Sequence, residues 1–170
     1  MRTAACEIRP ERPSDLLAIR GVHRRAFGQD QEANIVDALR ANGAMLVSLV
    51  ATLDGDIVAH VAYSPASIDS VDGAALGPIA VAPEHQKQGI GGRLIESGNR
   101  TLAATSCPFV IVLGYPTYYS RFGFVPARSR GISCEWDVPD DVFMVLALDE
   151  GRMQGVSGLA RYRHEFSTVT

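Results

Sequence analysis

Lysine is almost absent from this chain: Lys87 is its only lysine, and arginine supplies nearly all of the positive charge. The formal net charge is −3, and no run of basic residues interrupts the sequence. Nucleic acid and anionic membrane surfaces attract proteins through clustered cations. Neither is therefore expected as the main partner.

Cysteine and long apolar runs are also scarce. The three cysteines are widely spaced and form no CxxC pair: Cys6, Cys107 and Cys134. This spacing argues against a disulfide framework and a zinc site, and it favours a reducing cytoplasm. No segment approaches the roughly 18 apolar residues of a membrane span, so we expect no membrane partner. The N-terminal residues carry charges, Arg2 among them, and no apolar core, so we expect no signal peptide.

The periodicity of the apolar residues predicts a mixed α/β fold in one domain, residues 1–170, with the order β-α-α-β-β-β-α-β-α-β-β. With 46% hydrophobic and 21% charged residues, the composition is that of a globular protein. The expected strands are 7–9, 46–53, 57–63, 74–81, 109–113, 124–125 and 142–148. The expected helices begin near 13 and 30, span 90–104, and lie around 117–121.

Two local signals fix details of the expected sheet. Asp54-Gly55 lies between two apolar runs, which predicts a tight hairpin, because a type I′ turn needs positive φ at both central residues. Gly77-Pro78 interrupts the strand that ends at Val81. Proline donates no ladder hydrogen bond, so a bulge or an unpaired edge is expected there.

The segment that follows this strand is the main candidate for a binding site. Gln86-Lys-Gln-Gly-Ile-Gly-Gly92 leads directly into a helix. Glycines remove side chains where an anion must approach the backbone, and the free amides of a helix start suit a pyrophosphate. The alternative is that the glycines only permit a tight turn and close helix packing. A Walker A loop and a Rossmann fingerprint are absent.

Two motifs in order give a more specific resemblance. Gln86-x-x-Gly89-x-Gly91 is similar to the acyl-CoA signature of the GNAT superfamily of N-acetyltransferases. Tyr119-Ser-Arg-Phe-Gly-Phe124 resembles that superfamily's Y-x-x-x-G-F segment, one helix and one strand downstream. The run from Gly114 to Phe124, with the later Val138-to-Leu146 segment, resembles the YhbS-like branch in particular.

The resemblance implies the GNAT fold, a mixed and mostly antiparallel sheet flanked by helices, with acetyl-CoA as cosubstrate and no metal. The implied acyl-CoA contacts are backbone groups of the strand end together with the glycine loop and helix start: Ile79, Ala80, Val81, Gln86, Lys87, Gln88, Gly89, Ile90, Gly91 and Gly92. Tyr119 is implied as the acid that protonates the departing CoA thiolate. Its alternative role is that of a core aromatic beside Phe122 and Phe124.

The general base is not assigned by the sequence. The strand position where family members often carry an acid reads Leu76-Gly-Pro78 here. Glu84 and His85 follow on a loop, and His60 is interpreted as a core histidine that needs a partner. Lys87 is either a phosphate contact or an exposed loop residue. The other candidates considered are Arg93, read as a surface arginine, Cys134, read as a packing residue, and Trp136, which lines the acceptor pocket or packs a hairpin.

The resulting hypothesis is an N-acetyltransferase that moves an acetyl group from acetyl-CoA to a primary amine of a small molecule or peptide by direct attack. The alternatives are a longer acyl-CoA donor, limited by Pro78, Phe109 and Tyr115, and a non-catalytic acyl-CoA-sensing module. The acceptor face is expected from the first two helices, 64–72 and 135–141. Its carboxylates would suit a cationic amine: Asp69, Asp72, Glu135 and Asp137. A homodimer is compatible with the resemblance, although the chain shows no decisive interface stripe.

Overall fold

The computed structural model describes residues 5–169, so Arg2 lies outside the described chain. Its strands are β1 (Cys6–Pro10), β2 (Val47–Leu53), β3 (Asp56–Ile68), β4 (Val71–Val81), β5 (Phe109–Leu113), β6 (Val125–Pro126), β7 (Ile132–Cys134), β8 (Phe143–Ala147) and β9 (Gly158–Arg161). Its α-helices are α1 (Leu16–Phe27), α2 (Gln31–Ala41), α3 (Ile90–Ala103), α4 (Pro116–Tyr119) and α5 (Glu150–Met153). Short 3-10 turns join several of them, including η2 (Pro83–His85), η3 (Ser120–Phe122) and η6 (His164–Val169).

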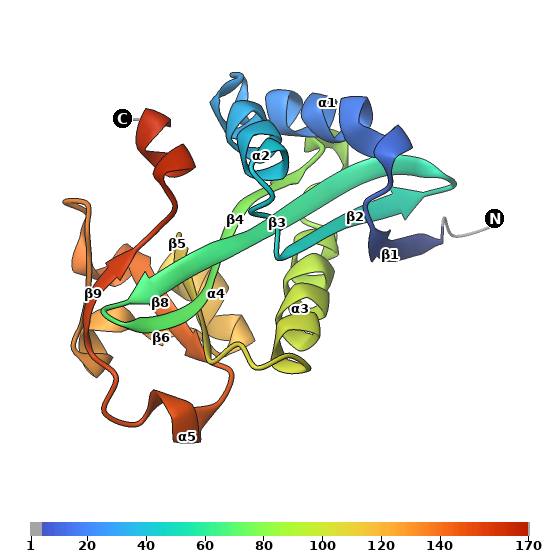
Figure 1. Ribbon diagram of the computed structural model, residues 1–170. Coiled ribbons are helices and arrows are strands. Elements are labelled where there is room, and N and C mark those ends of the chain that lie inside the picture. The colour runs from blue at the N-terminus through green and yellow to red at the C-terminus, as the bar shows by residue number, and fades with distance from the viewer. Residues whose placement is uncertain (1–4, 170) are drawn as a thin grey trace.

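The described strands form one mixed sheet in the order β1-β2-β3-β4-β5-β8-β6. Neighbours along this order are antiparallel except β4 and β5, which are parallel. The crossover between these two strands is α3, as a parallel connection requires. β9 pairs with the far end of β3 and runs parallel to β7. Figure 1 shows α1 and α2 on one face of the sheet and α3 on the other.

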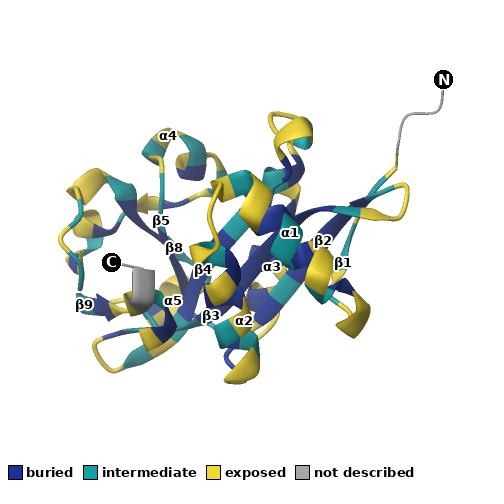
Figure 2. Cartoon of the chain, turned by 90° about the horizontal axis from the view of Figure 1, so that it is seen from above, coloured by how far each residue is buried: buried dark blue, intermediate teal, exposed yellow. Residues whose placement is uncertain are grey.

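Each helix is held by an apolar stripe. α3 buries Ile90, Leu94, Ile95 and Leu102 in the same core as the inward side chains of β2, β3 and β5. On the opposite face, Ile19 of α1 and Val36 of α2 pack on Val50. Figure 2 shows buried residues concentrated in the central strands, with exposed residues in the loops and on the outer sides of the helices. Burial of a large aliphatic side chain contributes about 1.5–3 kcal/mol, so these stripes fix the helices on the sheet.

The two local predictions for the sheet are confirmed. Asp54 and Gly55 have φ of 50° and 86°, as the β2–β3 hairpin requires. In the β3–β4 ladder, Val61 pairs with Ile79 but Tyr63 pairs with Leu76. Gly77 and Pro78 therefore stand opposite a single residue, which is a bulge. Beyond the bulge β4 leaves β5, because these strands pair only at Ala74–Val110 and Ala75–Ile111.

The predicted element order is right except near the C-terminus. The strands β7 and β9 are absent from the predicted order. Each of these strands is four residues or shorter. Their pairing depends on β3, which lies far away in sequence, so no local alternation marks them. The β3–β4 hairpin is also longer than predicted, since β3 continues to Ile68 and β4 begins at Val71.

Candidate functional site

The opening between the diverging ends of β4 and β5 holds a cavity of about 920 Å³. It is lined by the end of β4, the loop after it, the first turn of α3, and the segment from Leu113 to Phe122. Most of the predicted acyl-CoA contacts meet here: Ile79, Val81, Gln86, Lys87, Gly89, Ile90, Gly91 and Gly92. Ala80 and Gln88, which were also predicted, do not line it.

The backbone of β4 presents free positions to this cavity. Ala82 N–H donates to the Val58 carbonyl at 2.8 Å, and the register pairs Ala80 with His60. Because hydrogen-bonded pairs alternate along an antiparallel ladder, Ala80 bonds to β3, whereas the polar groups of Ile79 and Val81 point to the side that β5 has left. The side chain of Gln86 donates to the Val81 carbonyl at 3.0 Å, which confirms this direction.

The start of α3 faces the same space. Lys87 and Gly89 both have left-handed backbone, with φ of 63° and 81°, and Gly89 is the N-cap. The first intrahelical hydrogen bond runs from Arg93 N–H to the Gly89 carbonyl, so the amides of residues 90–92 have no helical acceptor. A Cβ on Gly91 would lie 3.0 Å from the Tyr118 hydroxyl, and one on Gly92 would lie 3.1 Å from Phe122. These glycines therefore serve close packing as well as access to the amides.

Basic side chains line the cavity together with these amides. Lys87, Arg93 and Arg121 contribute to its wall, and Glu96 is the one carboxylate there among the described residues. Arg93 is also tied to β1, because its Nη1 donates to the Cys6 carbonyl at 3.0 Å. Arg121, which the sequence analysis missed, lies 5.6 Å above the Tyr118 ring. The combination of helix amides and cations suits an anionic ligand.

Tyr119 lines the cavity although only 7% of its surface is exposed. Its ring packs edge-on against Phe124 at 5.7 Å and lies directly against Gly114, where a Cβ would overlap it. Burial, reinforced by Tyr118, raises the pKa of Tyr119, so its hydroxyl stays protonated at neutral pH. The ring of Tyr119 is thus packed in the core and still faces the cavity, which is compatible with either of its predicted roles.

The neighbouring aromatics take different places. Tyr118 and Tyr115 both line the cavity, and Tyr115 is 79% exposed. Burial raises the pKa of Tyr118. Phe109, proposed to limit the donor, is fully buried against Gly73 on β4 and does not line the cavity. Pro78 lines a second, adjoining cavity instead.

The loop candidates for a general base differ in their partners. Glu84 is ion-paired with Arg25 at the end of α1, and that hydrogen bond lowers the pKa of Glu84. His85 lines the cavity. Phe27, two residues beyond Arg25, lines it too. The ion pair therefore ties the end of α1 to the loop that carries His85.

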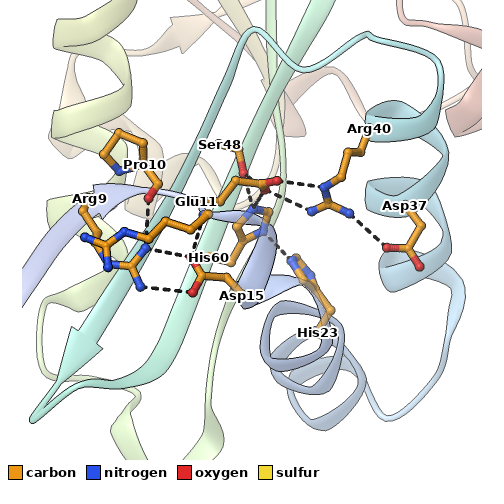
Figure 3. Close-up of polar contacts among 10 residues, drawn as sticks. Arg9, Pro10, Glu11, Asp15, His23, Asp37, Arg40, Ser48 and His60 are labelled. Atoms are coloured by element: carbon orange, nitrogen blue, oxygen red, sulfur yellow. Dashed lines mark hydrogen bonds and ion pairs between the residues drawn. The ribbon is translucent and has the colours of Figure 1, made fainter.

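His60 is a buried histidine with partners on both sides, as predicted (Figure 3). Its Nδ1 lies 2.8 Å from Nε2 of His23 on α1, and its Nε2 lies 2.8 Å from Ser48 Oγ. Ser48 donates onward to Glu11, whose carboxylate is also held by Arg40 at 2.8 and 3.0 Å. Burial lowers the pKa of His60 and lowers that of His23 to about 3. Neither ring lines the two cavities, so the network fixes α1 and α2 on the sheet.

Cys134 does not line either cavity. Cys134 packs against the core between β7 and β9, and burial raises the pKa of its thiol. Within residues 5–169, no group of three or more His, Cys, Asp or Glu side chains could hold a metal ion. A search of the same residues finds no helix with the length and apolarity of a membrane span.

The segments expected to form the acceptor face do not all lie together. A cavity of about 440 Å³ adjoins the first, and Phe27 and Leu113 line both. It receives residues from α2 and from 136–138, as expected, but none of its lining residues in the described chain comes from 64–72. Residues 64–72 form the β3–β4 hairpin instead. The sequence analysis missed Tyr162 and Phe166, which also line the cavity, because nothing local marks a C-terminal segment that returns to α2.

Comparison with known proteins agrees with this geometry. The family described as acetyltransferase (GNAT) domain matches residues 7–127. The uncharacterized N-acetyltransferase YhbS of Escherichia coli K12 is 35% identical over 163 residues, which cover 94% of this chain and 98% of YhbS. The predicted resemblance to the YhbS-like branch is thereby confirmed.

Two solved structures are similar over almost their whole length. Escherichia coli YhbS in complex with CoA has a TM-score of 0.93 and 34% identity, covering 98% of this chain and 94% of that chain. A GNAT family acetyltransferase from Brucella melitensis in complex with acetyl-CoA has a TM-score of 0.80 and 34% identity, covering 96% of this chain and 99% of that chain. The similarity therefore extends over almost the whole of this chain.

Proposed function

This chain belongs to the GNAT acetyltransferase family, and we propose that it transfers an acetyl group from acetyl-CoA to a primary amine by direct attack in a ternary complex. The observation that carries the proposal is the separation of β4 from β5 beyond Ala75 and Ile111. That separation opens a cavity bordered by unpaired strand backbone, a glycine-rich helix start and a buried tyrosine. The CoA and acetyl-CoA complexes of the two similar structures support it.

Acetyl-CoA fits the groups that line this cavity. The outward-facing backbone of Ile79 and Val81 can pair with the amides of the pantetheine arm as an added strand would. The amides of 90–92 at the start of α3 suit the pyrophosphate. Lys87 and Arg121 line the same cavity and add positive charge for the phosphates.

The transfer needs two groups from the protein besides binding. The amine nitrogen forms a bond to the thioester carbonyl carbon as the carbon–sulfur bond breaks. A backbone amide at Ile79 or Val81 would donate to the carbonyl oxygen, where negative charge develops. Tyr119 would donate its proton to the departing sulfur, and the proton released by the amine nitrogen would restore Tyr119 through solvent.

The raised pKa of Tyr119 is compatible with this role. A free thiol has a pKa near ~8.5, below that of a phenol. Burial raises the pKa of a thiol as well as that of a phenol, because it disfavours both anions. Because both pKa values rise in a buried site, the departing thiolate there is more basic than free CoA and can take the tyrosine proton.

A thermal-shift series tests the cofactor assignment. Acetyl-CoA, CoA and longer acyl-CoAs are compared with NAD and ATP. A ligand that binds only the folded state stabilises it by about 2.7 kcal/mol at a hundredfold excess over Kd. We expect a shift with the CoA esters alone, and their ranking distinguishes acetyl-CoA from longer donors. No shift in protein freed of co-purified CoA would show that the glycine loop is only structural.

Turnover then distinguishes an enzyme from an acyl-CoA-sensing module. With a mixed panel of primary amines, we expect CoA release that depends on both the amine and acetyl-CoA. Binding of acetyl-CoA without release of CoA for any amine would favour the sensing module.

A further inference from the structure

The second cavity has a wall of aromatic rings that pack against one another. The Trp136 and Tyr162 rings lie 4.7 Å apart between centroids, and Tyr162 and Phe166 lie 5.2 Å apart. All three side chains line the cavity, and they come from the segment after β7 and from the C-terminal end. Phe166 also packs on Ile35 and Leu39 of α2, which holds the C-terminal turn in place. The cavity is therefore bounded by large apolar surfaces that are fixed by the fold.

The boundary shared with the first cavity is apolar too. Phe27 and Leu113 line both spaces, and Leu76 and Pro78 from the β4 bulge line the second. β4 leaves β5 at this bulge, and the backbone of β4 just beyond it faces the first cavity. A molecule in the second cavity therefore lies next to that backbone. Nothing on this boundary carries a charge. An amine placed against these apolar side chains loses part of its hydration, which favours its neutral, nucleophilic form.

Charge in the second cavity is of one sign. Glu32 and Asp137 line it, and no arginine, lysine or histidine does among the described residues. Two of the other expected carboxylates are engaged elsewhere: Asp69 accepts from Leu159 N–H at 3.0 Å, and Glu135 accepts from Tyr162 N–H at 2.8 Å. The third, Asp72, does not line the cavity. Asp137 is exposed and forms no ion pair with any residue in the described chain. The two acids attract a protonated amine to the cavity.

Resting on the proposed function, we propose that the acceptor is a small primary amine with an aromatic or branched apolar body and no carboxylate. The body occupies the cavity beside Trp136, Tyr162 and Phe166, with the amino group directed to the boundary at Phe27 and Leu113. A 2-arylethylamine is the simplest molecule of this class. The volume of about 440 Å³ is in the usual range for small-molecule sites.

The same features disfavour the other amine classes. An α-amino acid would bring its carboxylate next to Glu32 and Asp137 with no cation to compensate, and like charges at close range are costly. A polyamine has no bulky apolar body, so its slender chain would leave the aromatic wall without a matching surface. A lysine side chain of a protein would fill the cavity with only a slender methylene chain, and it would leave the aromatic wall without a matching surface.

The apolar boundary also accounts for the missing acid in β4. The neutral amine forms the nitrogen–carbon bond as the carbon–sulfur bond breaks, and the products are the N-acetyl amine and CoA thiol. The ammonium form releases its extra proton to solvent as the amino group moves from the two acids to the apolar boundary. No carboxylate at the bulge is then needed to accept it.

The test compares 2-phenylethylamine, phenylalanine, spermidine and a lysine-containing peptide, with acetyl-CoA at saturation and CoA release as the readout. Phenylalanine differs from 2-phenylethylamine only by its carboxylate, so this pair measures the effect of the acidic lining. We expect kcat/KM for 2-phenylethylamine to exceed that for each of the others by about tenfold or more. A higher value for spermidine or the peptide would overturn the acceptor class while leaving the proposed function intact. If none of the four compounds is acetylated, the acceptor class is wrong. If the protein binds acetyl-CoA but acetylates no primary amine of the wider panel either, the proposed function is wrong as well.

Two variants connect the result to this cavity. Trp136→Ala should raise KM for 2-phenylethylamine about tenfold and leave acetyl-CoA binding, measured by thermal shift, unchanged. Asp137→Arg changes an exposed residue and is therefore safe for folding. It should raise the activity ratio of phenylalanine to 2-phenylethylamine, because it supplies a cation for the carboxylate. An unchanged ratio in Asp137→Arg together with an unchanged KM in Trp136→Ala would overturn the inference.

Discussion

The Nε2 atom of His23 on α1 lies 2.8 Å from the Nδ1 atom of His60 on β3, and both side chains are completely buried. A carboxylate only accepts, so Ser48 donates to Glu11 and accepts from His60 Nε2–H. A neutral His60 then accepts at Nδ1 from His23 Nε2–H. This order leaves the lone pair of His23 Nδ1 buried, and that atom has no hydrogen-bond partner in the described chain.

This pair predicts loss of stability in mild acid. Burial, with contributions from His60 and Arg40, lowers the pKa of His23 from 6.5 to about 3 in the folded state. Between these values the unfolded chain binds a proton that the folded chain does not. The contribution of His23 to the free energy of unfolding is therefore fully present above pH 6.5 and is lost as the pH falls toward 3. The loss is up to about 1.4 kcal/mol per pH unit for each buried neutral histidine. Urea unfolding from pH 8 to pH 4 measures this slope.

The matched variants are His23→Gln and His164→Gln. His23→Gln should lower the free energy of unfolding at pH 7.5 by about 1–3 kcal/mol, because His60 loses its partner. It should also reduce the slope of the free energy of unfolding against pH, because one titrating histidine is removed. His164 is exposed at 77% of its side chain and lies outside the buried His23–His60 pair, so His164→Gln is the control substitution. An equal slope in wild type and His23→Gln would contradict the buried neutral state.

Tyr119→Phe should lower kcat and leave the Kd for acetyl-CoA nearly unchanged. The ring is packed against Phe124 and Gly114 and is retained in the variant, so only the proton donor is lost. General acid catalysis contributes about 10²–10⁴-fold, so a loss in this range is expected. Tyr115→Phe is the control, because Tyr115 is largely exposed on the same cavity. If Tyr119→Phe turns over as fast as the wild type, Tyr119 is not the general acid.

Gly91→Ala should weaken acetyl-CoA binding. The new methyl group would lie 3.0 Å from the Tyr118 hydroxyl and 3.5 Å from Val81, at the side of the cavity where the helix amides are exposed. We expect Kd to rise about tenfold, which corresponds to about 1.4 kcal/mol. Isothermal titration with CoA measures this change.

Gly21→Ala is the control for that variant. Gly21 lies within α1, and a Cβ there meets nothing within 4 Å. It should raise the free energy of unfolding by about 0.5–1 kcal/mol, since alanine costs less backbone entropy in a helix, without changing Kd. An equal Kd in Gly91→Ala and wild type would show that the α3 start is not the phosphate site.

Gly98→Ala should destabilise the fold without touching the cavity. A Cβ at Gly98 would lie within 2.6 Å of the Tyr63 hydroxyl and Cζ, and Tyr63 is fully buried between α3 and β3. That hydroxyl donates to Asn99 Oδ1 at 2.9 Å. Overpacking of this kind costs about 1–3 kcal/mol, measurable by urea unfolding. A stable Gly98→Ala variant would show that α3 can shift away from the sheet.

The N-terminal three quarters of the fold was predictable from local signals. The hairpin at Asp54-Gly55, the bulge at Gly77-Pro78 and the helix from Ile90 were all placed correctly, because turn chemistry and periodicity depend on neighbouring residues. The C-terminal part was not predicted in the same way. β9 exists because residues near 67 and 132 lie beside it in the folded chain.

The site follows the same division. The glycines after Val81 and the tyrosine motif mark a family and a cofactor loop by residue type and spacing alone. Only the tertiary structure decided which side of Ile79 faces the opening and that Phe27 lines both cavities. It also decided that one cavity wall is formed by three distant aromatic residues, Trp136, Tyr162 and Phe166. A motif fixes the conformation of a few consecutive residues, whereas a cavity wall is made of side chains whose distance depends on packing across the whole sheet.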